Sequence, residues 1–233
     1  GLLTVASLLP EKYDIKLVDM NVEKLRDKDL EWADMVFLSA MEVQKDSLES
    51  VIARCKSMGK RIVAGGPLFT VQPEHYPEVD HLVLDEAETT IGPFLRDLES
   101  GDLKRVYTSK KRPDIRKVPV PSWDLINHRE YVAMLVQYSR GCPFNCEFCD
   151  IAYLNGRNPR TKSPEQVIGE MDSLYEMGWR KTVFFVDDNF IGNRGEVKRM
   201  LPHLVDWQKK RDFPFSFLTE ASVDLADDEE LMD

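Results

Sequence analysis

Three of the four cysteines lie in one short stretch, RGCPFNCEFCD, at positions 142, 146 and 149. Thiolates bind zinc and iron-sulfur clusters, and closed sites of both kinds take four protein ligands. The C-x3-C-x2-C spacing supplies three. A 4Fe-4S cluster held by three thiolates keeps one iron open, and an open iron can bind and reduce another molecule. Cys142, Cys146 and Cys149 therefore predict a metal centre with a free position for chemistry.

Two other interpretations of these cysteines stay open at this point. Asp150 or His128 could supply a fourth ligand and complete a zinc site. The three thiols could also be close together by chance, although exposed thiols without a ligand are reactive, which argues against it. The fourth cysteine, Cys55, lies on the apolar face of an expected helix and is typical of a small buried hydrophobic residue.

The second half of the chain repeats strand, loop and helix around the cysteines. Ser163 is the expected N-cap of a helix, with Pro164 at its first position and Gln166 at its third. The expected strands are 131–139, 182–189 and 215–221, and the expected helices are 163–178, 195–211 and the start of one at 224–233. This order predicts part of a (β/α) barrel with its functional loops at the carboxyl ends of the strands.

The first half alternates short apolar runs with helical patterns and predicts an α/β doubly wound sheet of the flavodoxin-like kind. The expected strands are 14–20, 35–41, 61–66 and 81–87, with helices at 1–10, 44–59 and 89–101. The chain opens inside a helix, so we expect this sheet to lack its first strand. Gly65 and Gly66 end one strand, where glycine lets the backbone approach a ligand, although their spacing alone favours an ordinary strand-to-loop turn.

The charge and composition of the chain argue against some classes of partner. The net charge is −10 in 233 residues, so no nucleic acid partner is expected. No run approaches the roughly 20 apolar residues of a transmembrane segment. Few cysteines and no secretory signal predict a cytoplasmic protein. A basic, proline-containing stretch predicts an interdomain linker, which gives domains at 1–102 and 131–233 joined by 103–130.

The motif RGCPFNCEFCD resembles the signature of the radical S-adenosylmethionine (SAM) superfamily. The segments RTKSPEQVIGEM, FFVDDNFIGN and FSFLTEASVDLADDEEL are similar to one branch of it, as are VPVPSWDLI, DHLVLDEAE and IVAGGPLF upstream. That branch has an N-terminal domain of the cobalamin-binding type ahead of the radical SAM barrel, and it includes the hopanoid methylases. The likeness covers nearly the whole chain.

The resemblance implies a function and a set of cofactors. Cys142, Cys146 and Cys149 would bind three irons of a 4Fe-4S cluster, and SAM would chelate the fourth iron and be cleaved reductively to a 5′-deoxyadenosyl radical. The expected reaction is methylation or another modification of an unactivated carbon in a small-molecule or lipid-like substrate. A flavodoxin or ferredoxin would supply electrons. Cobalamin is a further expected cofactor, bound near Gly65 and Gly66.

The resemblance also implies residues that contact SAM. Asp187, Asp188 and Asn189 end the second barrel strand, where the family holds the methionine amino group, and their oxygens can accept hydrogen bonds from an ammonium. Helix capping is the alternative for them. Glu220 ends the third strand and could contact SAM or substrate, or lie on the surface. Phe148 could pack beside adenine or support the loop.

No D-x-H-x-x-G cobalamin motif occurs, but the loop that carries it would lie before Gly1, so its absence is uninformative. The chain departs from the family pattern in two respects. Asp85 stands where related proteins have the glycine of G-E-x-E. The pattern predicts only the first half of a barrel, with an open sheet edge.

The alternatives to a radical SAM methylase are a tRNA methylthiotransferase, which has further cluster cysteines in its first domain, and a non-catalytic electron-transfer or zinc-stabilised binding module.

Overall fold

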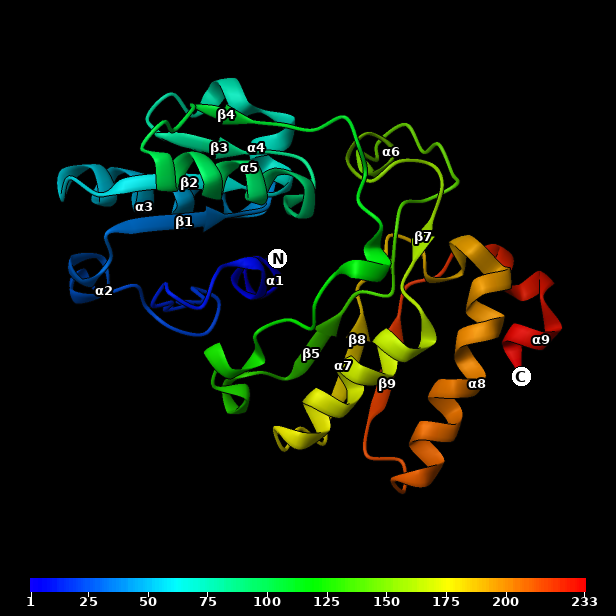
Figure 1. Ribbon diagram of the computed structural model, residues 1–233. Coiled ribbons are helices and arrows are strands. Elements are labelled where there is room, and N and C mark those ends of the chain that lie inside the picture. Colours follow the sequence, from blue (N-terminus) through cyan, green and yellow to red (C-terminus); the bar gives the residue numbers. More distant parts are fainter. The chain divides into compact units, whose positions relative to one another are not determined.

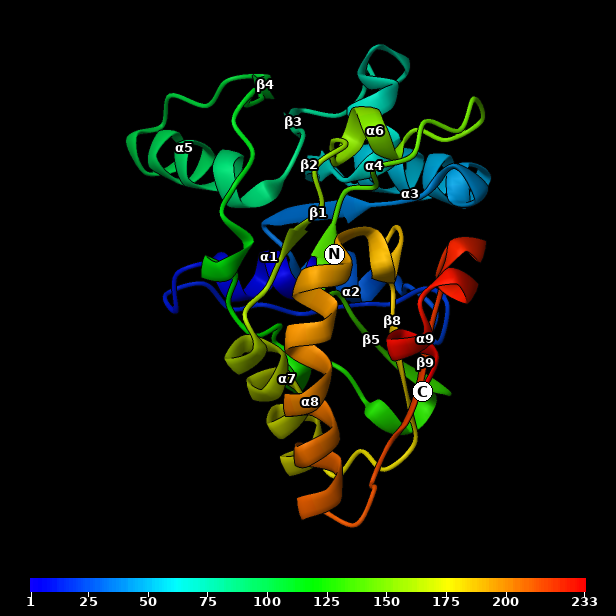
Figure 2. The same ribbon diagram turned by 90° about the vertical axis from the view of Figure 1, so that its right-hand side faces the viewer.

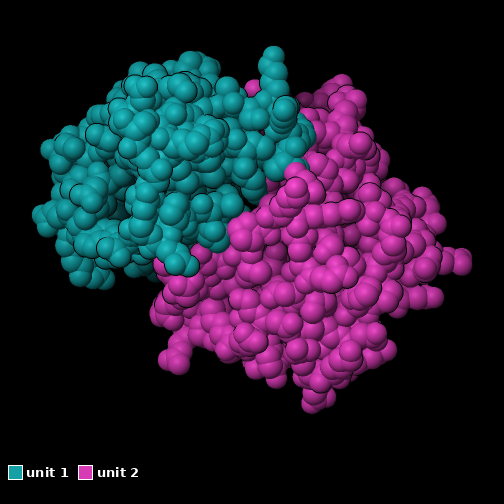
Figure 3. Space-filling view, viewed as in Figure 1, with its two compact units in different colours: residues 1–113 teal, residues 114–233 magenta.

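The computed structural model describes residues 1–233, which divide into two compact units, residues 1–113 and 114–233 (Figure 3). Each unit has a parallel sheet of its own (Figure 1). No helix of the chain combines the length and the apolar character needed to cross a bilayer. The division supports two domains, while the limits 1–102, 103–130 and 131–233 stay predictions.

The sheet of the first unit has four parallel strands in sequential order: β1 (Met35–Ser39), β2 (Arg61–Gly65), β3 (His81–Val83) and β4 (Val106–Tyr107). The strands expected at 35–41, 61–66 and 81–87 are confirmed. Their apolar runs are nearly continuous because both faces of the sheet are covered by helices. Ile62, Val63 and Ala64 of β2 are all buried.

Helices cover the two faces of this sheet unequally. One face packs against α2 (Asp27–Trp32), α3 (Lys45–Ser57) and α4 (Pro67–Val71), and the other against α1 (Leu2–Leu8) and α5 (Ala87–Ser100). Leu48, Val51, Ile52 and Cys55 form the buried stripe of α3, as their spacing predicts. Two helical layers on one parallel sheet make the α/β architecture that the sequence predicts.

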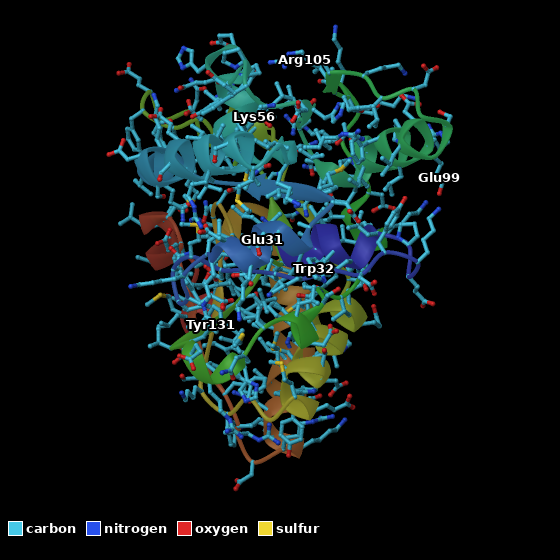
Figure 4. The ribbon with its side chains drawn as sticks, turned by 90° about the vertical axis from the view of Figure 1, so that its left-hand side faces the viewer. Glu31, Trp32, Lys56, Glu99, Arg105 and Tyr131 are labelled. Carbon is cyan, nitrogen blue, oxygen red and sulfur yellow. The ribbon has the colours of Figure 1, made fainter.

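The strand expected at 14–20 is wrong, because residues 14–19 form no hydrogen-bonded ladder with any strand of the four-stranded sheet. Part of the expected linker is strand β4, which pairs with β3. Arg105, which precedes β4 and is labelled in Figure 4, donates to the carbonyls of Tyr76, Pro77 and Val79. This segment is therefore fixed to the first unit.

The second unit has a sheet of three parallel strands in the order β5 (Ala133–Val136), β8 (Thr182–Phe185) and β9 (Ser216–Thr219). The helices α7 (Pro164–Glu176) and α8 (Arg194–Lys210) lie side by side along it (Figure 2). On the opposite face, Leu135 and Leu218 are 55% and 58% exposed, in register with Phe184 between them. This is the first half of a (β/α) barrel, as the sequence predicts.

Short elements complete the second unit. The strands β6 (Ser139–Arg140) and β7 (Arg160–Thr161) form an antiparallel pair, and α6 (Ile151–Leu154) lies between them in sequence. Only Ser139 of β6 falls within an expected strand, and neither β7 nor α6 was predicted. The remaining helix is α9 (Glu229–Met232), and single 3-10 turns occur at Glu42–Gln44, Pro73–His75, Ile115–Lys117, Trp123–Leu125, His128–Glu130, Phe190–Asn193 and Val223–Asp227.

The start of α7 is confirmed in detail. Ser163 Oγ accepts from the Gln166 backbone N–H at 3.3 Å, and Gln166 Oε1 accepts from the Ser163 N–H at 3.0 Å. This capping box satisfies two backbone donors that an uncapped helix leaves open. The Gln166 amide nitrogen also donates to the carbonyls of Ile115 and Val118, so part of the expected linker is fixed to the second unit.

Candidate functional site

The cysteine loop, residues 142–149, follows β6 and presents its three thiols at the surface. Cys142 is half-buried, Cys146 and Cys149 are exposed, and none forms a disulfide. The Cys149 N–H donates to the Cys146 carbonyl at 3.2 Å, which makes a turn between them. Three free, accessible thiols on one loop fit an iron-sulfur group in donor type.

The cysteine loop is not preorganised around a metal ion. No group of three or more His, Cys, Asp or Glu side chains in residues 1–233 is placed to hold one. His128, a possible zinc ligand, instead packs its ring edge-on against Trp179, with 6.4 Å between the ring centroids. Asp150, the other candidate, is exposed next to the loop. Ligation by the three cysteines therefore requires the loop to close around the metal group.

The two ends of the cysteine loop are held close together. Asp188 Oδ2 accepts from the Gly141 N–H at 2.7 Å and from the Asn155 side-chain amide at 2.9 Å. The Cys142 N–H donates to the Gly156 carbonyl at 3.1 Å. Gly141 has a φ of 104°, a conformation that favours glycine. The residues on either side of the loop are thus fixed to each other and to the end of β8.

Asp187 and Asn189 also bond to neighbouring loops. Asp187 is 4% exposed and accepts from the backbone N–H groups of Tyr138 and Ser139. Burial raises the pKa of its carboxyl to about 6, against the lowering effect of these hydrogen bonds. Asn189 donates to Ser222 Oγ at 3.0 Å and accepts from the Ser222 N–H at 3.2 Å.

Helix capping is the wrong explanation for Asp187, Asp188 and Asn189. The N-cap of α8 is Asn193, whose Oδ1 accepts from the Glu196 N–H, and Asn189 makes no side-chain bond to the 3-10 turn that follows it. Contact with SAM stays a prediction for all three. All three side chains instead form hydrogen bonds to loops that flank the end of β8. The sequence did not predict these contacts.

Phe148 and Glu220 have accessible side chains. Phe148 is 91% exposed in the cysteine loop, and nearby Phe144 is 44% exposed. Glu220 is exposed just after β9, and its backbone carbonyl accepts from the Phe190 N–H at 3.0 Å. Both side chains are free of packing that would prevent contact with a ligand. Their expected contacts with SAM or substrate stay predictions.

Gly65 and Gly66 have clear structural reasons for being glycine. A Cβ at Gly65 would lie 2.4 Å from the Val83 carbonyl of the adjacent strand. A Cβ at Gly66 would lie 2.5 Å from Ser39 Oγ, and its φ of 92° also favours glycine. Both residues lie at the carboxyl edge of the sheet, where α/β folds bind ligands. Their role near cobalamin stays a prediction.

Asp85, expected at the position of a glycine in related proteins, has a backbone conformation that glycine also adopts readily. Its φ is 60°, in the left-handed region that aspartate tolerates better than most residues. Its carboxylate accepts from Thr108 Oγ1 and from the Ser109 N–H, the latter at 2.9 Å. The side chain thereby links the end of β3 to the segment after β4.

We expect Asp85→Ala to destabilise the protein by about 1–2 kcal/mol, because alanine loses both hydrogen bonds and keeps the unfavourable φ. Asp85→Gly loses the same bonds but relieves the backbone, so its cost should be smaller. Urea denaturation of both variants measures the difference. An alanine variant at least as stable as the glycine variant would contradict this account.

Comparison with known families supports the two units separately. Residues 1–94 match the model of the B12 binding domain, and residues 136–232 match that of the radical SAM superfamily. The two matches together cover most of the chain. The chain therefore belongs to the radical SAM superfamily, in the branch that carries a B12-binding domain ahead of the radical SAM domain.

Particular relatives are methyltransferases. The chain is 48% identical to an uncharacterized methyltransferase of Synechocystis, over 100% of the chain and 44% of that protein. It is 38% identical to the hopanoid C-2 methylase of Rhodopseudomonas palustris, over 100% of the chain and 45% of that protein. A bacteriochlorophyllide d C-8(2)-methyltransferase of Chlorobaculum tepidum is 26% identical over 93% of the chain and 50% of its own length. The chain thus spans less than half of the first two relatives.

Solved structures share the fold. The cobalamin-dependent SAM radical enzyme OxsB, with aqua-cobalamin and SAM bound, has a TM-score of 0.64 and 21% identity, over 82% of this chain and 31% of its own. The radical SAM methyltransferase TsrM from Kitasatospora setae has a TM-score of 0.62 and 14% identity, over 81% of this chain and 43% of its own. At these identities the likeness supports the architecture alone.

Proposed function

We propose that this chain forms part of a cobalamin-dependent radical SAM methyltransferase that modifies an unactivated carbon. The observation that carries the proposal is the loop with three free thiols, Cys142, Cys146 and Cys149, in a chain that combines a B12-binding and a radical SAM domain. Relatives named as methylases of hopanoids and bacteriochlorophyllides support methylation. Since these relatives are named for hopanoids and bacteriochlorophyllides, we infer a lipid-like or other small-molecule substrate.

The residues present can be assigned to the cofactors by their chemistry. Cys142, Cys146 and Cys149 would hold a 4Fe-4S cluster with one iron left for SAM. A cluster held there would supply the electron for reductive cleavage of SAM, and a bound cobalamin would supply methyl-transfer chemistry. Phe148 is exposed and can stack on adenine, and Glu220 can accept a hydrogen bond from SAM or substrate.

The first unit would hold cobalamin at the carboxyl edge of its sheet. Gly65 and Gly66 leave backbone without side chains at that edge, and Asp85 keeps a left-handed backbone at the end of β3. Absence of side chains allows a large flat ligand to approach the strand ends closely. The reaction needs an external electron donor, for which we propose flavodoxin or ferredoxin. Accessible unpaired thiols suit a reducing compartment, so we propose the cytoplasm.

Anaerobic metal and sulfide analysis tests this proposal directly. After reconstitution with iron and sulfide, we expect about four irons and matching sulfide per chain, together with an electron paramagnetic resonance (EPR) signal of the reduced cluster that changes when SAM is added. About one zinc and no sulfide would instead favour the zinc-stabilised binding module. A cluster whose EPR signal does not change when SAM is added would favour the electron-transfer module.

A further inference from the structure

The segment that follows β8, residues 187–192, contacts the cysteine loop and its flanking residues at several points. Asp187 accepts from the backbone just before the loop, at Tyr138 and Ser139. A Cβ on Gly192 would lie 3.1 Å from a ring carbon of Pro159 and 3.4 Å from one of Pro143, so this glycine packs directly beneath the loop. This segment is therefore the surface against which the cysteine loop is positioned.

Asp188 makes the most specific of these contacts. One oxygen, Oδ2, accepts from the Gly141 N–H on one side of the loop and from the Asn155 side-chain amide on the other. Hydrogen bonds to a carboxylate are about twice as strong as those between neutral groups. Gly141 is 47 residues from Asp188 in sequence and Asn155 is 33, so neither contact is a local feature of the chain.

The backbone around Gly141 shows how closely the two sides of the loop approach. A Cβ on this residue would lie 2.8 Å from the Gly156 carbonyl and 3.2–3.3 Å from those of Asn158 and Asn155. The returning chain therefore lies directly against the residue before Cys142. Asp188 Oδ2 adds a hydrogen bond to each side, from the Gly141 N–H and from the Asn155 side-chain amide.

We propose that Asp188 is a positioning residue that keeps the two ends of the cysteine loop together, so that the three thiols can close on a single metal group. The proposal rests on the function proposed above, since it assumes that the cysteines bind a cluster. It assigns Asp188 Oδ2 to hydrogen bonds within the protein, from the Gly141 N–H and the Asn155 side-chain amide, rather than to the SAM ammonium. Without Asp188, the ends of the loop separate more easily, and closure around a metal group costs more conformational entropy.

The first test uses the metal-free protein and hydrogen exchange. In Asp188→Ala, the amides of peptides covering residues 138–143 should exchange about tenfold faster than in the parent, because the Gly141 N–H loses its acceptor. Asp188→Asn keeps an oxygen that can accept from both donors, so its exchange should lie close to the parent's. Equal exchange in the parent and the alanine variant would overturn the proposal.

The second test separates positioning from SAM binding. After reconstitution, Asp188→Ala should hold less than half of the parent's iron, and Asp188→Asn should recover most of it. The EPR signal of the residual cluster in the alanine variant should differ from the parent's before SAM is added. An alanine variant with parental iron and an unchanged spectrum that no longer responds to SAM would overturn the proposal and make Asp188 a SAM ligand.

The two tests also distinguish failure of this proposal from failure of the proposed function. If the parent protein binds no cluster, the proposed function is wrong, and the exchange experiment still decides whether Asp188 holds the loop. Asp206→Asn, at an exposed position of α8 outside the contacts with the cysteine loop, is the control for a general loss of negative charge, and it should leave both exchange and iron content unchanged.

Discussion

Replacing Cys146 with alanine will abolish reductive cleavage of SAM. The side chain is exposed in the middle of the cysteine loop, and Cys142 and Cys149 are the only other cysteines of that loop. Two thiolates leave a 4Fe-4S cluster with two irons lacking protein ligands, and such a cluster is not retained. We expect the iron content to fall to background and the release of 5′-deoxyadenosine from SAM to fall with it.

Cys55 provides the matched control for this experiment. It is fully buried in α3, and burial raises the pKa of its thiol, so it stays protonated and unavailable to a metal. Cys55→Ala should retain the parental iron content and SAM cleavage, at a cost of about 1 kcal/mol in stability from the lost packing. If Cys146→Ala still released 5′-deoxyadenosine at the parental rate, the assignment of the cysteine loop as the cluster site would be wrong.

The parts of the fold that the sequence predicts are those with strong local signals. The strands at 35–41 and 61–66 are continuous apolar runs, and the start of α7 combines Ser163, Pro164 and Gln166 within four positions. The expected strand at 14–20 has the right composition, but a strand also needs a neighbour, and its own residues carry no information on that. Strand β4 was missed because only two residues, Val106 and Tyr107, pair within a strongly basic stretch.

The residues of the candidate site also differ in whether the sequence predicts their role. The cysteines are visible from sequence because a cluster loop needs its ligands close together, so their spacing is a local signal. The contacts of Asp188 with Gly141 and Asn155 join positions far apart in sequence, and no single-sequence pattern reports them. A weak signal existed in the Asn155-Gly156 pair, which is typical of a turn and marks where the chain returns after the cysteines.

The second large effect is a loss of stability, expected when the buried ion pair between Lys162 and Glu170 is broken. Lys162 Nζ contacts Glu170 Oε1, and the two side chains are 5% and 2% exposed. The other carboxylate oxygen, Oε2, has no hydrogen-bond partner. Burial raises the pKa of Glu170, and the nearby Lys162 ammonium opposes this increase. The pair connects the residue after β7 to the middle of α7, so the loss of one partner leaves a charge in the core.

We expect Lys162→Met to destabilise the protein by about 3–5 kcal/mol, because Glu170 would be left buried without a cation. The double variant Lys162→Met/Glu170→Leu should recover most of this loss, since a well-packed apolar pair can replace a buried ion pair. Lys117→Met, at an exposed position of the same unit, should change stability by less than about 0.5 kcal/mol. Urea denaturation monitored by tryptophan fluorescence measures all three.

The pH dependence of the single variant distinguishes this explanation from a simple loss of packing. A carboxyl whose pKa is raised by folding favours the native state while it is protonated, and this contribution is lost as the pH rises through the folded-state pKa. Removing Lys162 takes away the group that lowers the pKa of Glu170, so the cost of Lys162→Met should be larger at pH 8 than at pH 5. The double variant lacks the carboxyl, so its own stability should lose the part of the pH dependence that Glu170 causes. A penalty for Lys162→Met that is equal at both pH values would mean that lost packing, and not the unpaired Glu170 carboxylate, causes the destabilisation.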